Sequence, residues 1–401
     1  MKNVVYVAPF PMSATLKFGN ALCDLPNVRV FMVTQKPPLA TLAKKYEKII
    51  TVSNALSSKQ LKEAVLQIQN VYGPIHRLLG VLENIQEQLA IVRENLNIVG
   101  MKPHTAHKFR DKGSMKEALR SVGVPCAKYK YVNNLQEAWN FIDLVGFPII
   151  LKPPAGAGCK ATYRVDNPQA LIDAIKEVPV RPILAEEFLT GAEHSMESFT
   201  VGGVPSFSSF SRYYPSPLEV MQNPHLQWVV LFPKEVEEPK YKKAREIGFR
   251  AIQALGLQTG MTHMEWFCRP DGSIAVGEIG ARPPGAQISE ITGLIHGFSV
   301  HRTWAELMVY DQLNIPTTRK KAAAVAFLRG IGQGKVYKIE GLDDAQKKMG
   351  SLVFDVSLPQ IGQPKSSTYE GEGWVIIQGQ KTENVKMAAL ELIRTVRIHY
   401  R

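Results

Sequence analysis

The stretch from Met261 to Gly285 reads MTHMEWFC, then RPDG, then SIAVGEIGARPPG. The RPDG segment has the residues of a tight turn, with Pro second and Gly fourth, and apolar runs flank it. This pattern predicts a β-hairpin. Side chains alternate between the two faces of a strand, so Glu265 and Glu278 share one face if the turn closes Arg269 against Gly272. The two carboxylates are then diagonal neighbours, about 7–8 Å apart at the backbone.

This pairing makes Glu265 face Val276 and His263 face Glu278. Two carboxylates among apolar neighbours are unfavourable unless a cation neutralises them. Mg²⁺ fits, because it takes oxygen ligands and is often completed by nucleotide phosphates. Arg282 follows, a planar cation suited to phosphate or carboxylate oxygens. The alternative is an exposed sheet face with two solvated carboxylates, and a bulge would break the pairing argument.

The composition is that of an ordinary globular protein. The chain has 401 residues, of which 45% are hydrophobic and 21% charged, which predicts two to four domains with a sizeable core. It has no apolar run of about 18 residues, so we expect no membrane partner. The first residues lack the features of a signal peptide, and the four cysteines are scattered, which fits a reducing compartment. We therefore expect a cytoplasmic protein.

The net charge of +12 favours anionic ligands. Lysine and arginine are dispersed, and no basic stripe is interleaved with stacking aromatic residues, so nucleic acid is not expected as a partner. Nucleotide phosphates are the simpler explanation of the charge. The sequence does not fix the oligomeric state, and a homodimer is compatible with it.

Strands alternate with helices over residues 1–103, which predicts a parallel α/β domain. No Gly-x-Gly-x-x-Gly follows the first strand, so a Rossmann dinucleotide site is not supported. One helix is predicted over His104–Gly123. A small α+β unit follows, in which the strand Phe147–Lys152 leads into the glycine-containing loop Pro153–Lys160. Such a loop lets backbone N–H groups approach phosphates.

In the second half of the chain, Phe207–Arg212 is predicted to be a strand and Tyr213–Pro233 a loop. Lys240–Leu255 is predicted to be a helix that leads into the central hairpin. Residues 321–401 contain several short strands and a final helix near Glu383–Val396. We expect this last part to be a C-terminal subdomain that packs on the rest.

Several short motifs follow one another in the order Asp111-Lys112, Ile149–Lys152 with its loop, Leu184–Leu189 with Glu193, Glu265, and Glu278–Arg282. This series resembles the ATP-grasp superfamily of carboxylate–amine and carboxylate–thiol ligases over roughly residues 100–320. Within it, the GMTHME and ARPPG segments look most like the L-amino acid ligases. The resemblance implies an α/β and α+β fold with four parts: an N-terminal parallel domain (1–103), a lid subdomain (104–190), an antiparallel catalytic core (191–320) and a C-terminal subdomain (321–401).

The resemblance also implies an ATP site formed by Lys112, Lys152, Ala155, Gly156, Gly158, Glu186, Glu187, Phe188, Leu189 and Glu193. In that site the two lysines would contact phosphates, and residues 155–160 would close over them as a lid. Glu186 and the Leu189 backbone would bind adenine, and Glu193 the ribose.

Catalytic roles follow from the same resemblance. Glu265 and Glu278 would hold Mg²⁺, or Mn²⁺ in its place, while Arg282 and Lys152 would stabilise charge in the reaction. Two departures from the family pattern stand out. Gly280 occupies a position where the family commonly has Asn, which puts a second metal ion in doubt, and Glu187 stands where several members carry Lys.

Three further residues are candidates for contacting the substrates. Arg212 is suited to a substrate carboxylate, with a surface role as the alternative. His263 and Gly285 are candidates for the substrate pocket, although a packed histidine is the more frequent role for a residue such as His263.

The implied activity is ATP-dependent and ADP-forming. It would join a carboxylate, from an amino acid in the first instance, to an amine through an acyl phosphate. Two alternatives are a ligase of a nucleotide or cofactor pathway with another nucleophile, and a nucleotide-binding regulator that has lost the chemistry. The presence of both glutamates and Arg282 speaks against the regulator.

Overall fold

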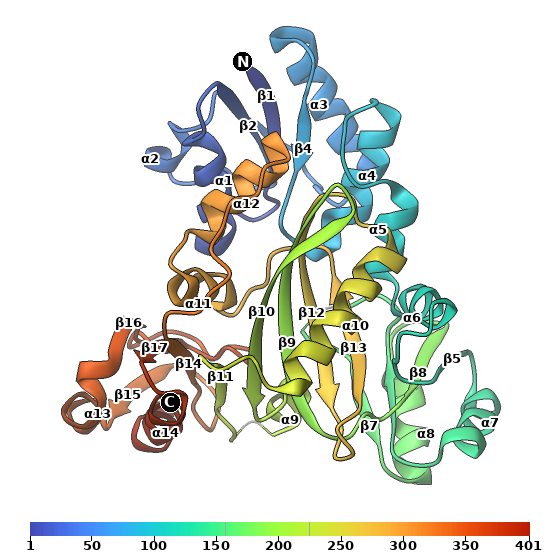
Figure 1. The fold of residues 1–401 in the computed structure, drawn as a ribbon, viewed down its shortest axis with the longest axis vertical. Coiled ribbons are helices and arrows are strands. Elements are labelled where there is room, and N and C mark those ends of the chain that lie inside the picture. The colour runs from blue at the N-terminus through green and yellow to red at the C-terminus, as the bar shows by residue number, and fades with distance from the viewer. Residues whose placement is uncertain (157, 224) are drawn as a thin grey trace.

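The computed structural model describes residues 1–156, 158–223 and 225–401. Its first part is a parallel sheet of order β3-β2-β1-β4, formed by β1 (Lys2–Val7), β2 (Val28–Thr34), β3 (Lys48–Thr51) and β4 (Arg77–Leu79). The inner strands are continuous apolar runs, as expected for strands covered on both faces. The predicted parallel α/β layer is therefore confirmed, and it lies at the top of Figure 1.

Helices cover both faces of this sheet. The helices of the first part are α1 (Ser13–Cys23), α2 (Ala40–Ala43), α3 (Ser58–Tyr72), the short 3₁₀ helix η1 (Glu83–Ile85) and α4 (Gln86–Asn95). One core joins α1 to α12 (Val300–Tyr310), whereas a second core on the other face joins α3 and α4. A helix from late in the chain thus completes the first layer.

The predicted single helix over His104–Gly123 is wrong, because the chain forms α5 (Pro103–Arg110) and α6 (Lys112–Ser121) instead. Asp111 between them is extended, and its carboxylate accepts a hydrogen bond of 2.7 Å from the Ser114 backbone N–H. An aspartate in this position caps the N-terminus of the following helix. The break fixes where Lys112 begins α6.

A small antiparallel sheet follows, with the order β5-β8-β6-β7. Its elements are β5 (Tyr129–Val132), α7 (Leu135–Val145), β6 (Ile149–Lys152), β7 (Tyr163–Val165), α8 (Pro168–Glu177) and β8 (Ile183–Glu187). Asn134 and Asn167 cap the two helices through their side-chain oxygens. The helices and one face of the sheet enclose a separate apolar core, so the predicted small α+β unit is present.

The centre of the molecule is an eight-stranded sheet of order β13-β12-β9-β10-β11-β14-β17-β16, which is antiparallel throughout. Its strands are β9 (Ala192–Val201), β10 (Val204–Tyr214), β11 (Trp228–Phe232), β12 (Gly260–Cys268), β13 (Ile274–Gly280), β14 (Ala322–Leu328), β16 (Val353–Ser357) and β17 (Gly373–Gly379). Helix α10 (Pro239–Leu255) packs on one face, and α11 (Ile288–His296) on the other.

The predicted loop Tyr213–Pro233 is wrong, because it contains α9 (Pro217–Gln222) and the fully buried strand β11. The run WVVLF, a short apolar segment between turn residues, is typical of a buried strand.

The last part of the chain shares the large sheet rather than forming one of its own. Strands β14, β17 and β16 extend that sheet beyond β11. The predicted boundary at residue 320 therefore separates strands that belong to one continuous sheet. The remaining elements are β15 (Val336–Glu340), α13 (Leu342–Met349), the 3₁₀ helix η2 (Gly350–Leu352), α14 (Thr382–Thr395) and β18 (Arg397–Tyr400), with β15 paired to β18. Helix α14 packs on β14 and β17.

In the part of the chain that the structure describes, no helix has the length and apolar character needed to cross a membrane.

Candidate functional site

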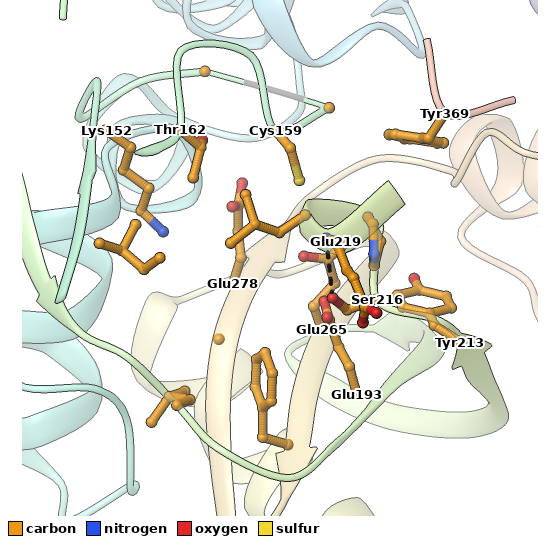
Figure 2. A pocket seen from close by; sticks show the side chains of 18 of the residues that line it. Lys152, Cys159, Thr162, Glu193, Tyr213, Ser216, Glu219, Glu265, Glu278 and Tyr369 are labelled. Carbon is orange, nitrogen blue, oxygen red and sulfur yellow. Dashed lines mark hydrogen bonds between the residues drawn. The ribbon is translucent and has the colours of Figure 1, made fainter. Parts of the chain in front are cut away.

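A hollow of about 530 Å³ lies between the small sheet, the large sheet and α9, and Figure 2 shows its interior. It brings together residues that lie far apart in the sequence. The predicted site residues that line it are Lys112, Lys152, Gly156, Gly158, Glu186, Glu187, Phe188, Leu189, Glu193, Arg212, His263, Glu265, Glu278, Arg282 and Gly285. Of the predicted lid, Ala155 is described but is not part of the lining, and Ala157 lies outside the described residues.

The hairpin of β12 and β13 has a different register from the predicted one. Glu265 pairs directly with Glu278, and His263 pairs with Gly280, so the predicted diagonal arrangement is wrong. The turn is wider by one residue, because the Arg269 N–H donates to the Ser273 carbonyl at 2.9 Å, and a bulge follows Glu265. The two carboxylates nevertheless share one face, as predicted, and Figure 2 shows both at the hollow.

On the side of the small sheet, lysines and carboxylates form ion pairs. Lys152 Nζ lies 2.8 Å from Glu186 Oε2, and Lys112 Nζ lies 3.0 Å from Glu278 Oε1. Lys116, which sequence reasoning missed, is fully buried, lies 3.2 Å from Glu186 Oε1 and donates to the Gly277 carbonyl at 2.8 Å. A sequence signal for Lys116 was present, because it follows Lys112 by four residues and therefore lies on the same face of α6.

These pairs shift the pKa values of the carboxylates. Burial alone would raise the pKa of Glu278, but the ammonium groups of Lys112 and Lys152 lower it to about 2. Burial would likewise raise the pKa of Glu186, and the charges of Lys116 and Lys152 hold it below its usual value. Both groups are therefore carboxylates at neutral pH.

On the side of the large sheet, acidic groups lie beside one another. Glu193 pairs with Phe267 and Glu265 with Ser195 across β9 and β12, so the two carboxylates are diagonal neighbours. Burial, followed by the charges of Glu265 and Glu278, raises the pKa of Glu193 well above its ordinary value. This part of the hollow therefore favours a cation.

His263 connects this acidic group to the buried interior of the large sheet. Its Nδ1 lies 2.9 Å from Oε1 of the fully buried Glu197, and its Nε2 lies 3.8 Å from Glu265 Oε1. Burial would lower the pKa of His263, but hydrogen bonds to Glu197 and Glu265 raise it to about 9. His263 thus presents a charged imidazolium next to Glu265. Glu197 was missed by the sequence analysis, and no motif marks it.

Arg282 is held by a carboxylate from the first layer of the molecule. Its Nε and Nη2 lie 3.1 and 3.0 Å from Glu83 Oε2, and Arg110 Nη1 lies 2.8 Å from Glu83 Oε1. Burial would lower the pKa of Arg282, but the charge of Glu83 raises it. Glu83 had not been assigned a role. Its position after β4, at the carboxyl edge of a parallel sheet, was a usable signal.

The glycine-containing loop contacts Lys112 at Gly156. Arg110 Nη1 and Lys112 Nζ each donate to the Gly156 carbonyl at 3.0 Å. Cys159 lines the hollow, and burial raises the pKa of its thiol, so it is a neutral group rather than a thiolate nucleophile.

Two of the substrate candidates differ in their surroundings. Arg212 faces the opposite side of β10 from Tyr213, and its guanidinium stacks on the ring of Tyr214 at 4.7 Å. Gly285 lines the hollow just before α11.

The family model for the ATP-grasp domain matches residues 117–286. The L-arginine-specific L-amino acid ligase of Bacillus subtilis is 22% identical over 321 residues, which cover 77% of this chain and 76% of that protein. An uncharacterised protein of Sinorhizobium fredii is also 22% identical, over 69% of this chain, and the chain spans only 57% of its length. The crystal structure of an L-amino acid ligase from Bacillus licheniformis aligns over 100% of this chain and 99% of its own, with a TM-score of 0.81 and 19% identity. The structural likeness shows a shared fold.

Proposed function

We propose that this chain, whose residues 117–286 match the ATP-grasp domain model and whose fold is shared with an L-amino acid ligase, is an ATP-dependent, ADP-forming ligase of the ATP-grasp superfamily. Its reaction joins an amino acid carboxylate to an amine through an acyl phosphate. The observation that carries this proposal is the convergence in one hollow of Lys112, Lys152, Arg282, Glu265 and Glu278. Positive groups for a triphosphate and paired carboxylates for a cation are the parts that phosphoryl transfer requires.

The lysine side of the hollow is suited to the phosphates of ATP. Glu278 holds the side chain of Lys112 in place, and Glu186 holds that of Lys152. We infer that ATP phosphates replace these carboxylates as partners of the two ammonium groups. The segment Glu186–Leu189 lines the same hollow and would receive adenine, with Glu193 near the ribose.

The carboxylate side fits a divalent cation such as Mg²⁺ or Mn²⁺. The described residues contain no group of three or more histidine, cysteine or acidic side chains arranged to hold a metal by themselves. Glu265 and Glu278 face each other directly, and burial together with their charges raises the pKa of the neighbouring Glu193. The two carboxylates would therefore hold an ion whose coordination the nucleotide completes. When bound, the ion neutralises charge on the phosphates.

In the first chemical step a carboxylate oxygen of the substrate attacks the γ-phosphorus, and the bond to the β–γ bridging oxygen breaks to release ADP. In the second step an amine attacks the acyl carbon of the acyl phosphate. The tetrahedral intermediate then expels phosphate, and the amine loses a proton. Arg282, fixed by Glu83, is placed to stabilise the negative oxygens in both steps. The glycine loop would keep water from the acyl phosphate.

An amino acid as the carboxylate substrate is supported by the L-arginine-specific ligase among the relatives. The particular amino acid and the amine are not specified by this comparison.

The test is interception of the acyl phosphate. The protein is incubated with ATP, Mg²⁺, single amino acids and hydroxylamine, a small nucleophile that replaces the amine. We expect a hydroxamate together with ADP in equal amounts. Formation of AMP and pyrophosphate would contradict the mechanism. If neither product forms with any amino acid but other carboxylic acids react, the amino acid assignment fails and the ligase assignment stands.

A further inference from the structure

Three aromatic side chains border the hollow on the side away from the lysines. They are Tyr213 at the end of β10, Trp228 at the start of β11, and Tyr369 from the segment before β17. Figure 2 shows Tyr213 and Tyr369 on the opposite side of the hollow from Lys152. None of the roles assigned above uses these rings, which we call the aromatic wall.

The aromatic wall is rigidly packed. The ring of Trp228 lies between Phe327, stacked at 5.0 Å, and Tyr369, edge-on at 4.7 Å. Tyr213 lies 5.4 Å from Trp228, and the indole N–H of Trp228 donates to the Pro215 carbonyl at 3.1 Å. Rings fixed in this way lose little freedom when a ligand packs on them.

The segment that carries Tyr369 is anchored at both ends. The Ser366 N–H donates to the buried Glu372 carboxylate at 2.6 Å, and the Glu372 N–H donates to the Leu328 carbonyl at 3.0 Å. Gly371 has a φ of 67°, and a Cβ there would lie 2.4 Å from the Leu328 carbonyl oxygen, so the close approach requires glycine. The C-terminal part of the chain thereby places one ring in the hollow.

Tyr369 lines the same hollow as Arg282 and Glu265, the groups that we assign to the reacting carboxylate and the metal ion. Burial, and the negative charges of Glu370 and Glu265, raise the pKa of Tyr369, while the charge of Arg282 opposes this. Across the mouth of the hollow, a Cβ on Gly158 of the glycine loop would lie 3.7 Å from the Tyr369 ring. A substrate whose carboxylate is at Arg282 therefore has the aromatic wall within reach of its side chain.

We propose that the aromatic wall is the side-chain subsite of the carboxylate substrate and that it selects amino acids with large aromatic side chains. This rests on the proposed function. Besides the three rings, Leu218 and Ile288 line the hollow, so a large side chain would lose its contact with water there. Rings also gain from edge-on contacts with Tyr369, which Trp228 supports from behind. A small side chain would leave these contacts unmade.

The hydroxamate assay tests this subsite alone, because hydroxylamine removes the amine substrate from the measurement. We compare kcat/KM for phenylalanine, arginine and alanine in the wild type and in Tyr369→Ala, Tyr369→Leu and Tyr369→Phe. Tyr337→Ala is the matched control, because Tyr337 is 49% exposed on β15 and is not part of the hollow.

We expect the wild type to prefer phenylalanine over alanine by at least about tenfold, as apolar pockets do for large side chains. Tyr369→Ala and Tyr369→Leu should lower kcat/KM for phenylalanine about tenfold, mainly through KM, and change it for alanine less than about threefold. Tyr369→Phe keeps the ring and should retain the preference for phenylalanine over alanine, whereas Tyr337→Ala should change neither value. If Tyr369→Ala does not fold, Tyr369→Leu decides.

A preference for alanine or arginine over phenylalanine overturns the inference while leaving the ligase function intact. An equal loss for phenylalanine and alanine in Tyr369→Leu also overturns it, because the ring would then act on closure or folding rather than on selection. Absence of ADP and hydroxamate with every amino acid in the wild type overturns the amino acid assignment of the proposed function and this inference together.

Discussion

The two sides of the hollow differ in whether their charged side chains have partners of opposite charge. On the small-sheet side, Lys112, Lys116 and Lys152 each have a carboxylate partner within 3.2 Å. On the large-sheet side, Glu193 has Glu265 as its neighbour, and burial and this negative charge raise its pKa. Among the described residues, Glu193 forms no ion pair. The lysine side is thus neutralised within the protein, whereas Glu193 on the large-sheet side is not.

This difference indicates how each side would bind its ligand. On the lysine side an incoming anion must displace a carboxylate, so binding exchanges one ion pair for another. The same carboxylates hold the lysine side chains in position before the anion binds. On the carboxylate side an incoming cation relieves repulsion that the folded chain carries without it. Glu278 belongs to both sides, because it pairs with Lys112 and faces Glu265 across the hairpin.

The largest effect should come from Glu278, where the two sides meet. Glu278→Gln keeps the shape but removes the charge opposite Glu265, so turnover should fall by about 10²–10³-fold, as losses of charge-stabilising groups do. The measurement is ADP formation at saturating Mg²⁺ and substrates. Glu391→Gln, which breaks a surface pair with Lys348, is the control. A near-normal rate in Glu278→Gln would remove this residue from the site.

The next effect tests the neutralised side. Glu186→Gln leaves the buried ammonium groups of Lys116 and Lys152 without their shared counter-charge, so the free energy of unfolding should fall by about 3 kcal/mol. The pKa of Glu186 is lowered in the folded state. Its contribution is therefore present above the ordinary pKa of a glutamate and is lost as pH falls through the folded-state value.

Urea unfolding of both proteins at pH 7 and at a series of acidic pH values below the ordinary pKa of a glutamate measures this contribution. The difference between wild type and Glu186→Gln should shrink toward the acid end. If the free energies of unfolding of wild type and Glu186→Gln differ by less than about 1 kcal/mol at pH 7, the ion pairs of Glu186 with Lys116 and Lys152 do not stabilise the fold.

The smallest effect tests the side with uncompensated charge. Because the folded-state pKa of Glu193 is raised, the carboxyl group contributes stability below its ordinary pKa and loses it as pH rises through the folded value. Glu193→Gln removes this penalty and should stabilise the ligand-free protein at pH 8 by about 1 kcal/mol, with little effect at pH 4.

Melting temperatures in EDTA at the two pH values check this. Glu187→Gln is the comparison, because Glu187 lies 3.6 Å from Arg269 and accepts a hydrogen bond from the Lys128 N–H. It should not gain stability. An unchanged melting temperature for Glu193→Gln at pH 8 would show that the acidic cluster is solvated, and the comparison between the two sides would no longer hold.

Much of the site could be predicted from the sequence, because its residues stand next to local signals. Glu265 and Glu278 flank a turn, Lys152 ends a strand before a glycine-containing loop, and Glu186 lies in an apolar strand. Their register could not be predicted in the same way. The bulge after Glu265 leaves Gly277 without a partner in the register, and the Gly277 carbonyl accepts a hydrogen bond from the distant Lys116. Each one-residue slip of this kind changes every pairing beyond it.

The sequence by itself determined the elements whose patterns are local: the parallel layer, the small sheet with its capped helices, and the hairpin with two carboxylates on one face. Only the tertiary structure decided the contacts between distant segments. It joined Glu83 to Arg282 across 199 positions, buried Lys116 against Glu186, and brought Tyr369 from the end of the chain to the hollow. The physical reason is that periodicity and capping act within a few residues, whereas ion pairs and ring packing depend on how separate layers meet.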